Sequence, residues 1–359
     1  MTVLASRLTR LRSAANMFES LFSNRPLQAR YCWVPALAQQ LQQALQAEAT
    51  AFKVVHVEHL RAVEYGLSVR RLLGGQRHVP VLWDSVDCIS MLFEQAIRYS
   101  RTRFGRWATR FELPATRRYE GWAVGQFDQV LVTSRVDQAA LEQLVQAAAG
   151  RSGAPAPGRP IRVLPNGVDL SHFKPPENPR EPATVVLSGK MSYHANVTAA
   201  HQLVGGIMPI VWAADPTVKV MLVGSTPTPD VRALAKRYAP LVTVTGYVPD
   251  MQPFLQSATL AAAPMAYGAG IQNKVLEAMA CGTATVASPQ AIAALPDSVR
   301  QALLVAGDDP SSAAAILSIL QNPALRARLE ERGRAYVCEH FDWSSVTAEL
   351  ETIYDGLVS

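Results

Sequence analysis

The second half of the chain alternates between short apolar runs and helical segments, and this alternation restricts the fold more than any other feature. The apolar runs have the length of buried strands. Strands that alternate with helices predict a parallel, doubly wound α/β sheet, in which ligands bind at the carboxyl ends of the strands. The expected strands are Thr184–Ser188, Lys219–Gly224, Val242–Val248, Leu260–Pro264 and Thr283–Ala287, and the expected helices lie near 196–213, 230–238, 251–257 and 273–281.

Glycines stand at or near the carboxyl ends of four of these strands. They occur in Gly189-Lys190, at Gly224, in Gly246-Tyr-Val-Pro249 and in the stretch Gly268–Lys274. The carboxyl ends of parallel strands meet along one edge of a sheet, so we expect these four segments to converge. Four convergent glycine segments are more specific than any one of them. In the last segment, the backbone N–H groups of a glycine loop precede a helix, where an anion is favoured.

The helix expected after that loop carries two side chains of interest. Asn273–Cys281 is rich in good helix formers, and Gly282 stands where glycine commonly ends a helix. Lys274 and Glu277 are three residues apart and share one face of its first turn. The lysine suits a diphosphate, and the carboxylate can accept two hydrogen bonds from a ribose diol. The alternative is a surface ion pair on an ordinary α/β crossover.

The stretch Gly268-Ala-Gly-Ile-Gln-Asn-Lys-Val-Leu-Glu-Ala-Met-Ala-Cys-Gly282 resembles the nucleotide-sugar signature of the retaining glycosyltransferases of family 4. Its Gly-Ile-Gln-Asn-Lys form is similar to a sub-branch found in polysaccharide gene clusters. Glu277 matches the second glutamate of the signature, which holds the donor ribose. The first glutamate would fall at Ala269 and is absent, and Ala284 replaces the usual proline. The departure at Ala269 leaves open how the sugar ring and the phosphates are held, and Lys274 is a candidate for part of that role.

The resemblance implies the GT-B architecture, in which two Rossmann-like, doubly wound parallel-sheet domains face a cleft. Residues 1–173 would form the acceptor-side domain, 174–182 a proline-rich linker, 183–340 the nucleotide-sugar domain, and 341–359 a helix that crosses back to the first domain. In the family, a strand and a glycine-rich loop precede the position of Val54. In this chain the segment before Val54 instead begins with an expected helix. The resemblance therefore implies an N-terminal truncation that removes the first strand and the glycine loop.

The resemblance also assigns site residues. The catalytic residues would be His59, Lys190, Lys274 and Glu277. Of these, Lys190, Lys274 and Glu277 would hold the donor, and His59 would reach the donor sugar and the acceptor. The donor-binding residues would be Gly189, Gly224, Tyr247, Val248, Pro249, Gly270, Ile271, Gln272, Asn273 and Leu276. The acceptor-side residues would be Glu58, Arg61, Asp84, Asp87 and Asn166.

Several of these assignments have alternatives. Lys190 could be a solvated surface lysine, and either Glu58 or His59 could occupy the family's histidine position. Asp84 and Asp87 follow the second expected strand, where each could orient the acceptor hydroxyl, act as a base or cap a loop. Three other polar residues lie near these motifs. His56 is predicted to be buried within a strand and Asn196 to be a helix N-cap, while the role of His194 stays open.

The first half of the chain reads as α/β as well, with a helix at its start. Apolar residues at helical spacing, interrupted by Arg7, Arg10 and Arg12, predict an amphipathic helix over 2–22, which is either buried or lies on a membrane surface. The other expected elements are strands at Val54–Glu58, Val79–Trp83, Gln129–Thr133 and Ile161–Leu164, and helices over 34–49, 91–127, 134–149, 311–321, 323–339 and Trp343–Leu357.

Charge and cysteine content narrow the class of protein. Residues 1–160 hold 20 Lys and Arg against 12 Asp and Glu, a net of +8, while the whole chain carries +5. This asymmetry suggests peripheral contact with an anionic membrane, and no aromatic-interleaved basic motif supports nucleic-acid binding. The 4 cysteines lack CxxC spacing, which argues against a zinc site. No run reaches the ~18–20 apolar residues of a membrane span, and no signal-peptide pattern opens the chain, so we expect a cytoplasmic protein.

With these features, the resemblance implies a retaining, hexosyl-type glycosyltransferase that moves a sugar from a nucleoside-diphosphate donor to a glycan or lipid-linked acceptor, in polysaccharide or cell-envelope glycan synthesis. No Asp-x-Asp stands at a strand end, so we expect no metal requirement and no cofactor beyond the nucleotide sugar. Two rival functions remain. One is a truncated relative that binds donor without activity, and the other is a sugar-nucleotide epimerase or phosphorylase on the same fold.

Overall fold

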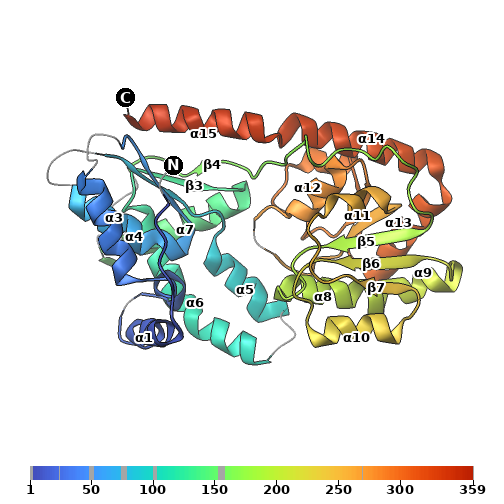
Figure 1. Cartoon of the computed structure of the whole chain (residues 1–359), viewed down its shortest axis with the longest axis horizontal. Helices are drawn as coiled ribbons and strands as arrows, with labels where there is room; N and C mark the ends of the chain where they lie inside the picture. The colour runs from blue at the N-terminus through green and yellow to red at the C-terminus, as the bar shows by residue number, and fades with distance from the viewer. Residues whose placement is uncertain are drawn as a thin grey trace. The chain divides into compact units, whose positions relative to one another are not determined.

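The computed structural model describes residues 3–23, 25–47, 52–73, 79–99, 103–152, 158–268 and 270–358. The chain divides into two compact units, shown in Figure 1. The first unit comprises Met1–Arg98, Thr102–Leu164 and Thr347–Ser359, and the second comprises Tyr99–Arg101 and Pro165–Val346. The expected departure from the family at Ala269 lies outside the described residues.

The first unit contains a parallel sheet in the order β1-β2-β3-β4. Trp83 and Phe127 pack against each other in its core, together with Val57 and Leu141. The strands are β1 (Val55–Glu58), β2 (Val81–Asp84), β3 (Gln129–Val132) and β4 (Arg162–Val163). The helices are α1 (Arg10–Leu21), α2 (Leu27–Arg30), α3 (Pro35–Ala47), α4 (Val63–Leu73), α5 (Ile89–Tyr99), α6 (Arg103–Val124) and α7 (Arg135–Ser152).

The second unit contains a six-stranded parallel sheet in the order β10-β9-β8-β5-β6-β7. Figure 1 shows α8 and α10 on one side of its strands and α12 and α14 on the other. The strands are β5 (Thr184–Ser188), β6 (Lys219–Val223), β7 (Val242–Val244), β8 (Leu260–Ala263), β9 (Ala284–Ala287) and β10 (Leu304–Val305). The helices are α8 (His194–Gln202), α9 (Met208–Ala214), α10 (Pro229–Arg237), α11 (Gln252–Ser257), α12 (Asn273–Ala280), α13 (Asp309–Gln321), α14 (Pro323–His340) and α15 (Trp343–Val358).

Helices α8 and α9 are joined through a π-helical turn, Leu203–Ile207, into one apolar helix. Among the described residues, this helix alone is long and apolar enough, by length and composition, to cross a membrane. Ala199, Leu203 and Ile207 are almost fully buried at helical spacing. The helix therefore packs as a core helix of the second unit, with the apolar character that such a position requires.

The start of the chain differs from its prediction. The helix expected over 2–22 begins only at Arg10, because Thr9 is its N-cap and accepts a hydrogen bond from the Arg12 N–H at 3.2 Å. The residues before Thr9 that the structure describes are not helical. Burial of the apolar face also fails, since Leu11 is 85 % exposed and Phe22 is 77 % exposed.

The boundary between the two units lies at Pro165 and not after residue 173. The segment that follows Pro165 is tied to the end of α14, because the Val168 N–H donates to the Phe341 carbonyl at 2.7 Å. Gly167 lies directly against the Trp343 ring, where a Cβ would come within 2.6 Å. Helix α15 starts in the second unit, and its residues from Thr347 onward belong to the first.

Candidate functional site

The strand order of the second unit fixes where its ligand crevice lies. From β5 the chain moves outward through β6 and β7, and it then returns to the other side of β5 to place β8, β9 and β10. The order of strands therefore reverses between β5 and β8. In open α/β sheets, ligands bind outside the carboxyl ends of the strands at such a switch point. The segments at this point are Gly189-Lys190 after β5 and the glycine loop after β8.

Glycines allow the strand ends to approach each other here. Gly189 and Gly224 have φ values of +139° and +146°, which other residues rarely adopt. A Cβ built on Gly224 would lie 1.8 Å from the Gly189 carbonyl oxygen. Side chains are thus excluded from this edge for two reasons, backbone conformation and close contact, and backbone groups line it instead.

Lys274 reaches this edge from the first turn of α12. A Cβ on Gly189 would stand 3.4 Å from Lys274 Cε, so the lysine stem lies against the end of β5. The Lys274 ammonium donates to Gln272 Oε1 at 2.9 Å. Burial lowers the pKa of Lys274 to about 8, and the nearby Glu277 carboxylate partly opposes that shift. A half-buried ammonium with one neutral partner is well prepared to receive an anion.

Glu277 lies one turn further along α12. Burial raises the pKa of Glu277, while Lys274 and His172 act in the opposite direction. Lys274 and Glu277 are both described, and they form no ion pair in the structure, so the alternative of a surface i,i+3 pair is wrong. The two side chains are instead available to separate parts of one ligand.

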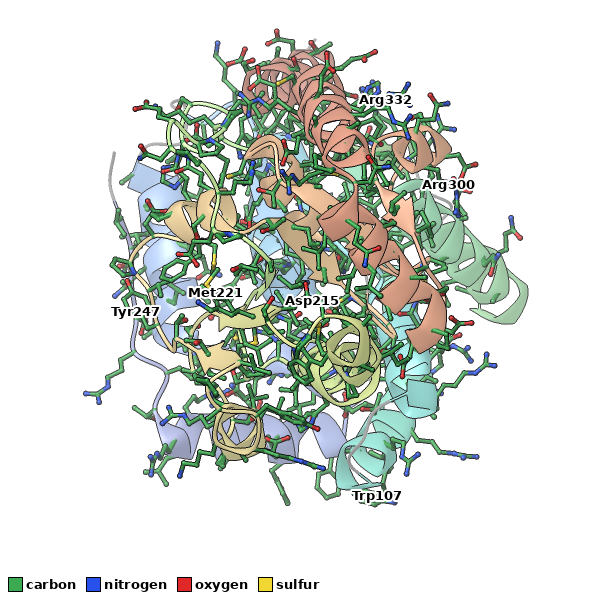
Figure 2. The ribbon with its side chains drawn as sticks, turned by 90° about the vertical axis from the view of Figure 1, so that its right-hand side faces the viewer. Trp107, Asp215, Met221, Tyr247, Arg300 and Arg332 are labelled. Carbon is green, nitrogen blue, oxygen red and sulfur yellow. The ribbon has the colours of Figure 1, made fainter. Side chains whose placement is uncertain are left out.

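A pocket of about 300 Å³ opens beside these residues. Lys190 supplies a cation, Glu277 an anion, and Phe173 and Met251 apolar surface. Tyr247, at the edge of the unit in Figure 2, is 77 % exposed and contributes an open aromatic ring. The full lining is Phe173, Gly189, Lys190, Gly224, Ser225, Tyr247, Val248, Met251 and Glu277.

Arg180 fixes the far end of α12. Its guanidinium donates to the carbonyl groups of Cys281 and Gly282, at 3.0 and 2.6 Å, and so satisfies acceptors at the helix C-terminus. It also donates to the Gln256 carbonyl at the end of α11, at 2.7 Å, and pairs with Glu330 at 3.3 Å. The expected linker therefore includes a residue that anchors the helix carrying Lys274 and Glu277.

His194 and Asn196 connect the loop after β5 to its neighbours. His194 Nδ1 lies 2.7 Å from the Tyr267 hydroxyl, which joins the start of α8 to the loop after β8. Burial lowers the pKa of His194. Asn196 was predicted to be a helix N-cap, and this prediction is wrong, because α8 begins at His194 and Tyr193 holds the cap position. Its amide instead donates to the Lys190 carbonyl at 3.1 Å and holds that loop.

The other predicted donor residues have different surroundings. Gly270 adopts a φ of +60°. Ile271 and Gln272 are buried in the loop before α12, and Leu276 is fully buried on the core face of that helix. Pro249 is exposed and is not among the pocket residues, although Tyr247 and Val248 are.

Asn166 is placed differently from its prediction. It was expected on the acceptor side, but it belongs to the second unit, where its amide donates to Asn273 Oδ1 at 3.3 Å. The reason is the same bridge to the end of α14 that shifts the boundary of the units to Pro165. Asn166 and Asn273, both predicted as site residues, are thus brought together at the start of α12.

Two of the predicted acceptor-side residues, together with His59, lie at the carboxyl end of β1. Glu58 is the last residue of β1, and His59 follows with a φ of +64°. The side chains of Glu58 and His59 are 68 % and 56 % exposed, and His59 Nε2 stands 3.7 Å from Glu58 Oε1. Arg61 is exposed in the turn that follows. Both Glu58 and His59 are thus accessible at this strand end.

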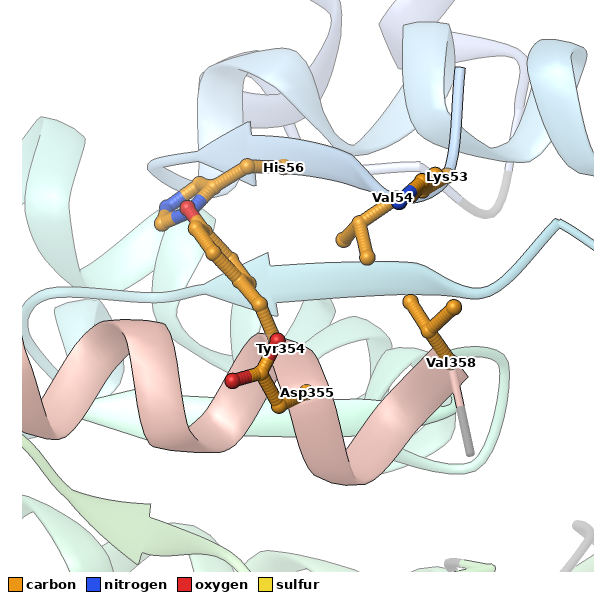
Figure 3. Close-up of a pocket in the computed structure, with 6 residues that line it drawn as sticks. All are labelled: Lys53, Val54, His56, Tyr354, Asp355 and Val358. Atoms are coloured by element: carbon orange, nitrogen blue, oxygen red, sulfur yellow. The ribbon is translucent and has the colours of Figure 1, made fainter. Parts of the chain in front are cut away.

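Asp84 is a loop cap, which was one of its predicted roles. Its Oδ1 accepts the Val86 N–H at 2.9 Å, and its Oδ2 lies 3.7 Å from His56 Nε2. His56 in turn lies 2.6 Å from the Tyr354 hydroxyl of α15. Figure 3 shows this histidine and tyrosine at a pocket of about 380 Å³. The pocket extends toward Lys53 and Val54 at the start of β1, away from the carboxyl ends of the strands, so it is a poor candidate for the ligand site.

Asp87 stands among buried carboxylates that sequence reasoning missed. Burial, with the Asp137 and Asp84 carboxylates nearby, raises the pKa of Asp87 to about 7. Glu120 accepts the N–H groups of Ile89 and Ser90 at the start of α5, and Asp137 accepts the Cys88 N–H at 2.9 Å. Glu120 and Asp137 are capping groups brought together by long-range contacts, so no local sequence pattern marks them.

The part of the chain that the structure describes contains no group of three or more His, Cys, Asp or Glu arranged to hold a metal ion. The positive groups nearest the candidate anion site are instead Lys190 and Lys274, together with the N-terminus of α12. These groups can stabilise negative charge on a leaving group without a metal ion.

Comparison with known sequences gives a match within the second unit. Residues 182–322 match the family described as Glycosyl transferases group 1. A phosphatidyl-myo-inositol mannosyltransferase of Mycobacterium tuberculosis is 30 % identical over 210 residues, which cover 54 % of this chain and 53 % of that protein. An uncharacterised glycosyltransferase of Methanocaldococcus jannaschii is 30 % identical over 94 residues, 26 % of this chain and 24 % of that protein. The chain spans about half the length of the first of these relatives, and less of the second.

Solved structures extend the likeness to both units. A sucrose-phosphate synthase of Thermosynechococcus elongatus superposes with a TM-score of 0.69 at 21 % identity, covering 93 % of this chain and 82 % of that one. The HepE protein of Anabaena, solved with UDP and glucose, superposes with a TM-score of 0.67 at 15 % identity, covering 89 % and 82 %. The chain has the GT-B fold of two Rossmann-like α/β units, and its residues 182–322 match the family described as Glycosyl transferases group 1.

Proposed function

We propose that this protein is a retaining glycosyltransferase that moves a sugar from a nucleoside-diphosphate donor to a glycan or lipid-linked acceptor. The observation that carries the proposal is the pocket at the switch point between β5 and β8, which Lys190 and Glu277 line, with the Lys274 stem against Gly189 at the same strand end. Two cations and a helix N-terminus suit a diphosphate, and a carboxylate one helical turn away suits a ribose diol. The match to glycosyl transferases group 1 over the same residues supports the same donor class.

The relatives support this donor and suggest acceptors. The HepE structure contains UDP and glucose, and the mycobacterial relative is a mannosyltransferase that acts on a phosphatidylinositol. A hexose donor and a lipid-linked or glycan acceptor are therefore the first substrates to test. We place the protein in polysaccharide or cell-envelope glycan synthesis, in the cytoplasm or at the inner face of the membrane.

The residues of the pocket have separate roles in the proposed transfer. The bond between the anomeric carbon and the diphosphate oxygen breaks, and the acceptor oxygen bonds to that carbon on the same face, which retains configuration. The acceptor proton passes to the departing diphosphate. Lys274, Lys190 and the N-terminal N–H groups of α12 stabilise the charge that develops on the leaving group. We propose that neither a divalent metal nor a cofactor takes part.

The test is a transfer assay that measures nucleoside-diphosphate release from a panel of nucleotide sugars, with and without candidate acceptors. Lys274→Met should reduce turnover by at least about a hundredfold, the usual effect of removing one group that stabilises transition-state charge. Lys219→Met is the matched control, because Lys219 lies at the amino end of β6, away from the pocket, and its loss should leave turnover unchanged.

Three other results would contradict the proposal. Excess chelator that abolishes transfer, with recovery on adding magnesium, would disprove metal independence. Donor binding without transfer to any acceptor would favour the inactive relative, and interconversion of the nucleotide sugar itself would favour an epimerase.

A further inference from the structure

Helix α1 packs with its polar side inward. Asn16 is fully buried, and its amide donates to the carbonyl groups of Tyr31 and Trp33 at 3.2 and 2.9 Å. Ser20, one turn later, is also buried and donates to the Met17 carbonyl at 2.7 Å. A surface helix of a globular protein usually buries its apolar stripe and exposes its polar one. In α1 this arrangement is reversed.

The outward side of α1 is apolar. Leu11, Phe18 and Phe22 are 85 %, 63 % and 77 % exposed, and their spacing of seven and four residues places them on one stripe that continues past the helix end. The rings of Phe18 and Phe22 pack against each other with centroids 4.8 Å apart.

The start of α6 adds two more aromatic side chains. Trp107 and Phe111 are 65 % and 63 % exposed and stack with centroids 6.3 Å apart. Figures 1 and 2 both place α1 and the start of α6, where Trp107 is labelled, at the same end of the first unit. Helix α2 connects them, because the Leu27 N–H donates to Glu112 of α6 at 2.9 Å and Arg30 pairs with Glu19 of α1.

Arginines accompany these aromatic side chains. Arg7 and Arg10 are exposed at the start of α1, and Arg106 and Arg110 are exposed beside Trp107 and Phe111. The acidic residues of the same segments are engaged elsewhere. Glu19 pairs with Arg12 and Arg30, and Glu112 accepts the Leu27 N–H. The exposed surface therefore combines aromatic rings with positive charge.

We propose that the outer side of α1 and the first turns of α6 bind an anionic lipid bilayer. Aromatic and aliphatic side chains enter the boundary between headgroups and acyl chains, and flanking arginines attract anionic headgroups. Contact with the bilayer would bury the apolar side of α1, which accounts for the inward orientation of its polar side. This inference concerns a surface of the first unit and does not depend on the function proposed for the pocket of the second.

The experiment is sedimentation of the whole protein with vesicles of phosphatidylcholine alone or mixed with phosphatidylglycerol. We expect binding to the mixed vesicles to exceed binding to phosphatidylcholine by at least about tenfold, and to fall in roughly 0.5 M salt, where charges are screened. Phe18→Ser with Phe22→Ser should reduce binding by at least about tenfold. Val136→Ser with Ile210→Ser, which removes two exposed apolar side chains elsewhere, should leave it unchanged.

A second pair of variants tests the charge. Arg106→Gln with Arg110→Gln should weaken binding to the mixed vesicles, with a loss of roughly fivefold per arginine. Arg328→Gln with Arg332→Gln removes two exposed arginines at the same spacing on α14 and should have no effect. Circular dichroism and light scattering of each variant check folding and oligomeric state.

Three results would overturn the proposal. The first is equal binding of the wild-type protein to both kinds of vesicle, or binding to neither. The second is equal loss of binding in the control variants. The third is a wild-type protein that does not bind vesicles but self-associates through this surface, with a monomer produced by Phe18→Ser and Phe22→Ser. The wild-type comparison remains decisive if the aromatic variants fail to fold.

Discussion

Lys274 carries its ammonium group in a partly buried position, and burial moves its titration closer to neutral pH. In the folded protein its pKa is lowered to about 8 by burial, so the ammonium form is held at neutral pH and is lost as pH rises through that value. A bound diphosphate requires the charged form. Affinity for a nucleoside diphosphate should therefore fall above pH 8, by up to roughly tenfold per pH unit.

Calorimetric titration between about pH 7 and pH 9.5 measures this effect. Lys274→Met should bind more weakly at neutral pH and show a flatter profile. A wild-type profile that is flat over the whole range would mean that Lys274 does not contact the diphosphate.

Asp87 should make the stability of the fold depend on pH. Its folded-state pKa is raised from 3.8 to about 7, so the charged form is disfavoured in the folded state. Stability is therefore lost as pH rises from about 4 through 7. Asp87→Asn removes the charge and should stabilise the protein at about pH 8, by on the order of 1 kcal/mol, with little effect at about pH 4. Urea unfolding at both pH values is the measurement, and destabilisation of the variant at both would refute this account.

Sequence reasoning located residues whose roles depend on their near neighbours in the chain. Lys274 and Glu277 share one turn of α12, and Gly282 ends that helix with a φ of +63°, as predicted. The contact of His194 with Tyr267 was not predictable, because these residues are 73 positions apart. The positions of Phe173 and Met251 at the pocket were not predictable either, because Phe173 was assigned to the end of the first domain and Met251 to the start of a helix.

At the scale of elements, the close approach of β5 and β6 at their carboxyl ends is decisive for the site. Gly224→Ala would place a Cβ against the Gly189 carbonyl and strain a positive φ, and should cost about 3–5 kcal/mol. Gly246→Ala is the matched control, because Gly246 also has a positive φ but no heavy atom lies within 4 Å of the point that the new methyl group would occupy. It should cost only about 1–2 kcal/mol. Equal losses in chemical unfolding would show that contact with β5 is unimportant.

Arg180 should be essential for the end of α12. Arg180→Met leaves the carbonyl groups of Cys281 and Gly282 without this donor and should destabilise the second unit by about 2–4 kcal/mol. Hydrogen exchange should show faster opening of residues 273–282. Arg326→Met is the control, since Arg326 approaches the same Glu330, at 3.8 Å, on the surface of α14. Similar exchange in both variants would rule out the anchoring role.

Element prediction succeeded where periodicity and local signals agreed. The expected strand at Thr184–Ser188 is identical to β5, and the parallel arrangement of the second sheet is confirmed. The helix expected over 91–127 is instead two helices, α5 and α6, and the two-residue strand β10 was not predicted. The apolar stripe of α1 was visible in the sequence, but its outward orientation was not, because burial of Asn16 and Ser20 depends on the segment around Tyr31.

For the whole molecule, sequence likeness and fold likeness have different extents. The mycobacterial relative covers 54 % of the chain, while the sucrose-phosphate synthase structure covers 93 %. The GT-B fold thus persists where the sequence has diverged. The family match lies in the second unit, so a donor site could be predicted there from sequence. The predicted acceptor side of the first unit rested only on strand ends that carry polar residues.

The central claim is that the second unit binds a nucleoside diphosphate through the residues at the switch point between β5 and β8. Isothermal titration calorimetry with UDP, GDP and ADP tests it most directly, on the wild-type protein, Glu277→Gln and Lys219→Met. We predict that at least one diphosphate binds the wild type and Lys219→Met equally, and that Glu277→Gln weakens it by about 1–3 kcal/mol. Equal affinity for the wild type and Glu277→Gln, or no binding of any diphosphate, would contradict the account.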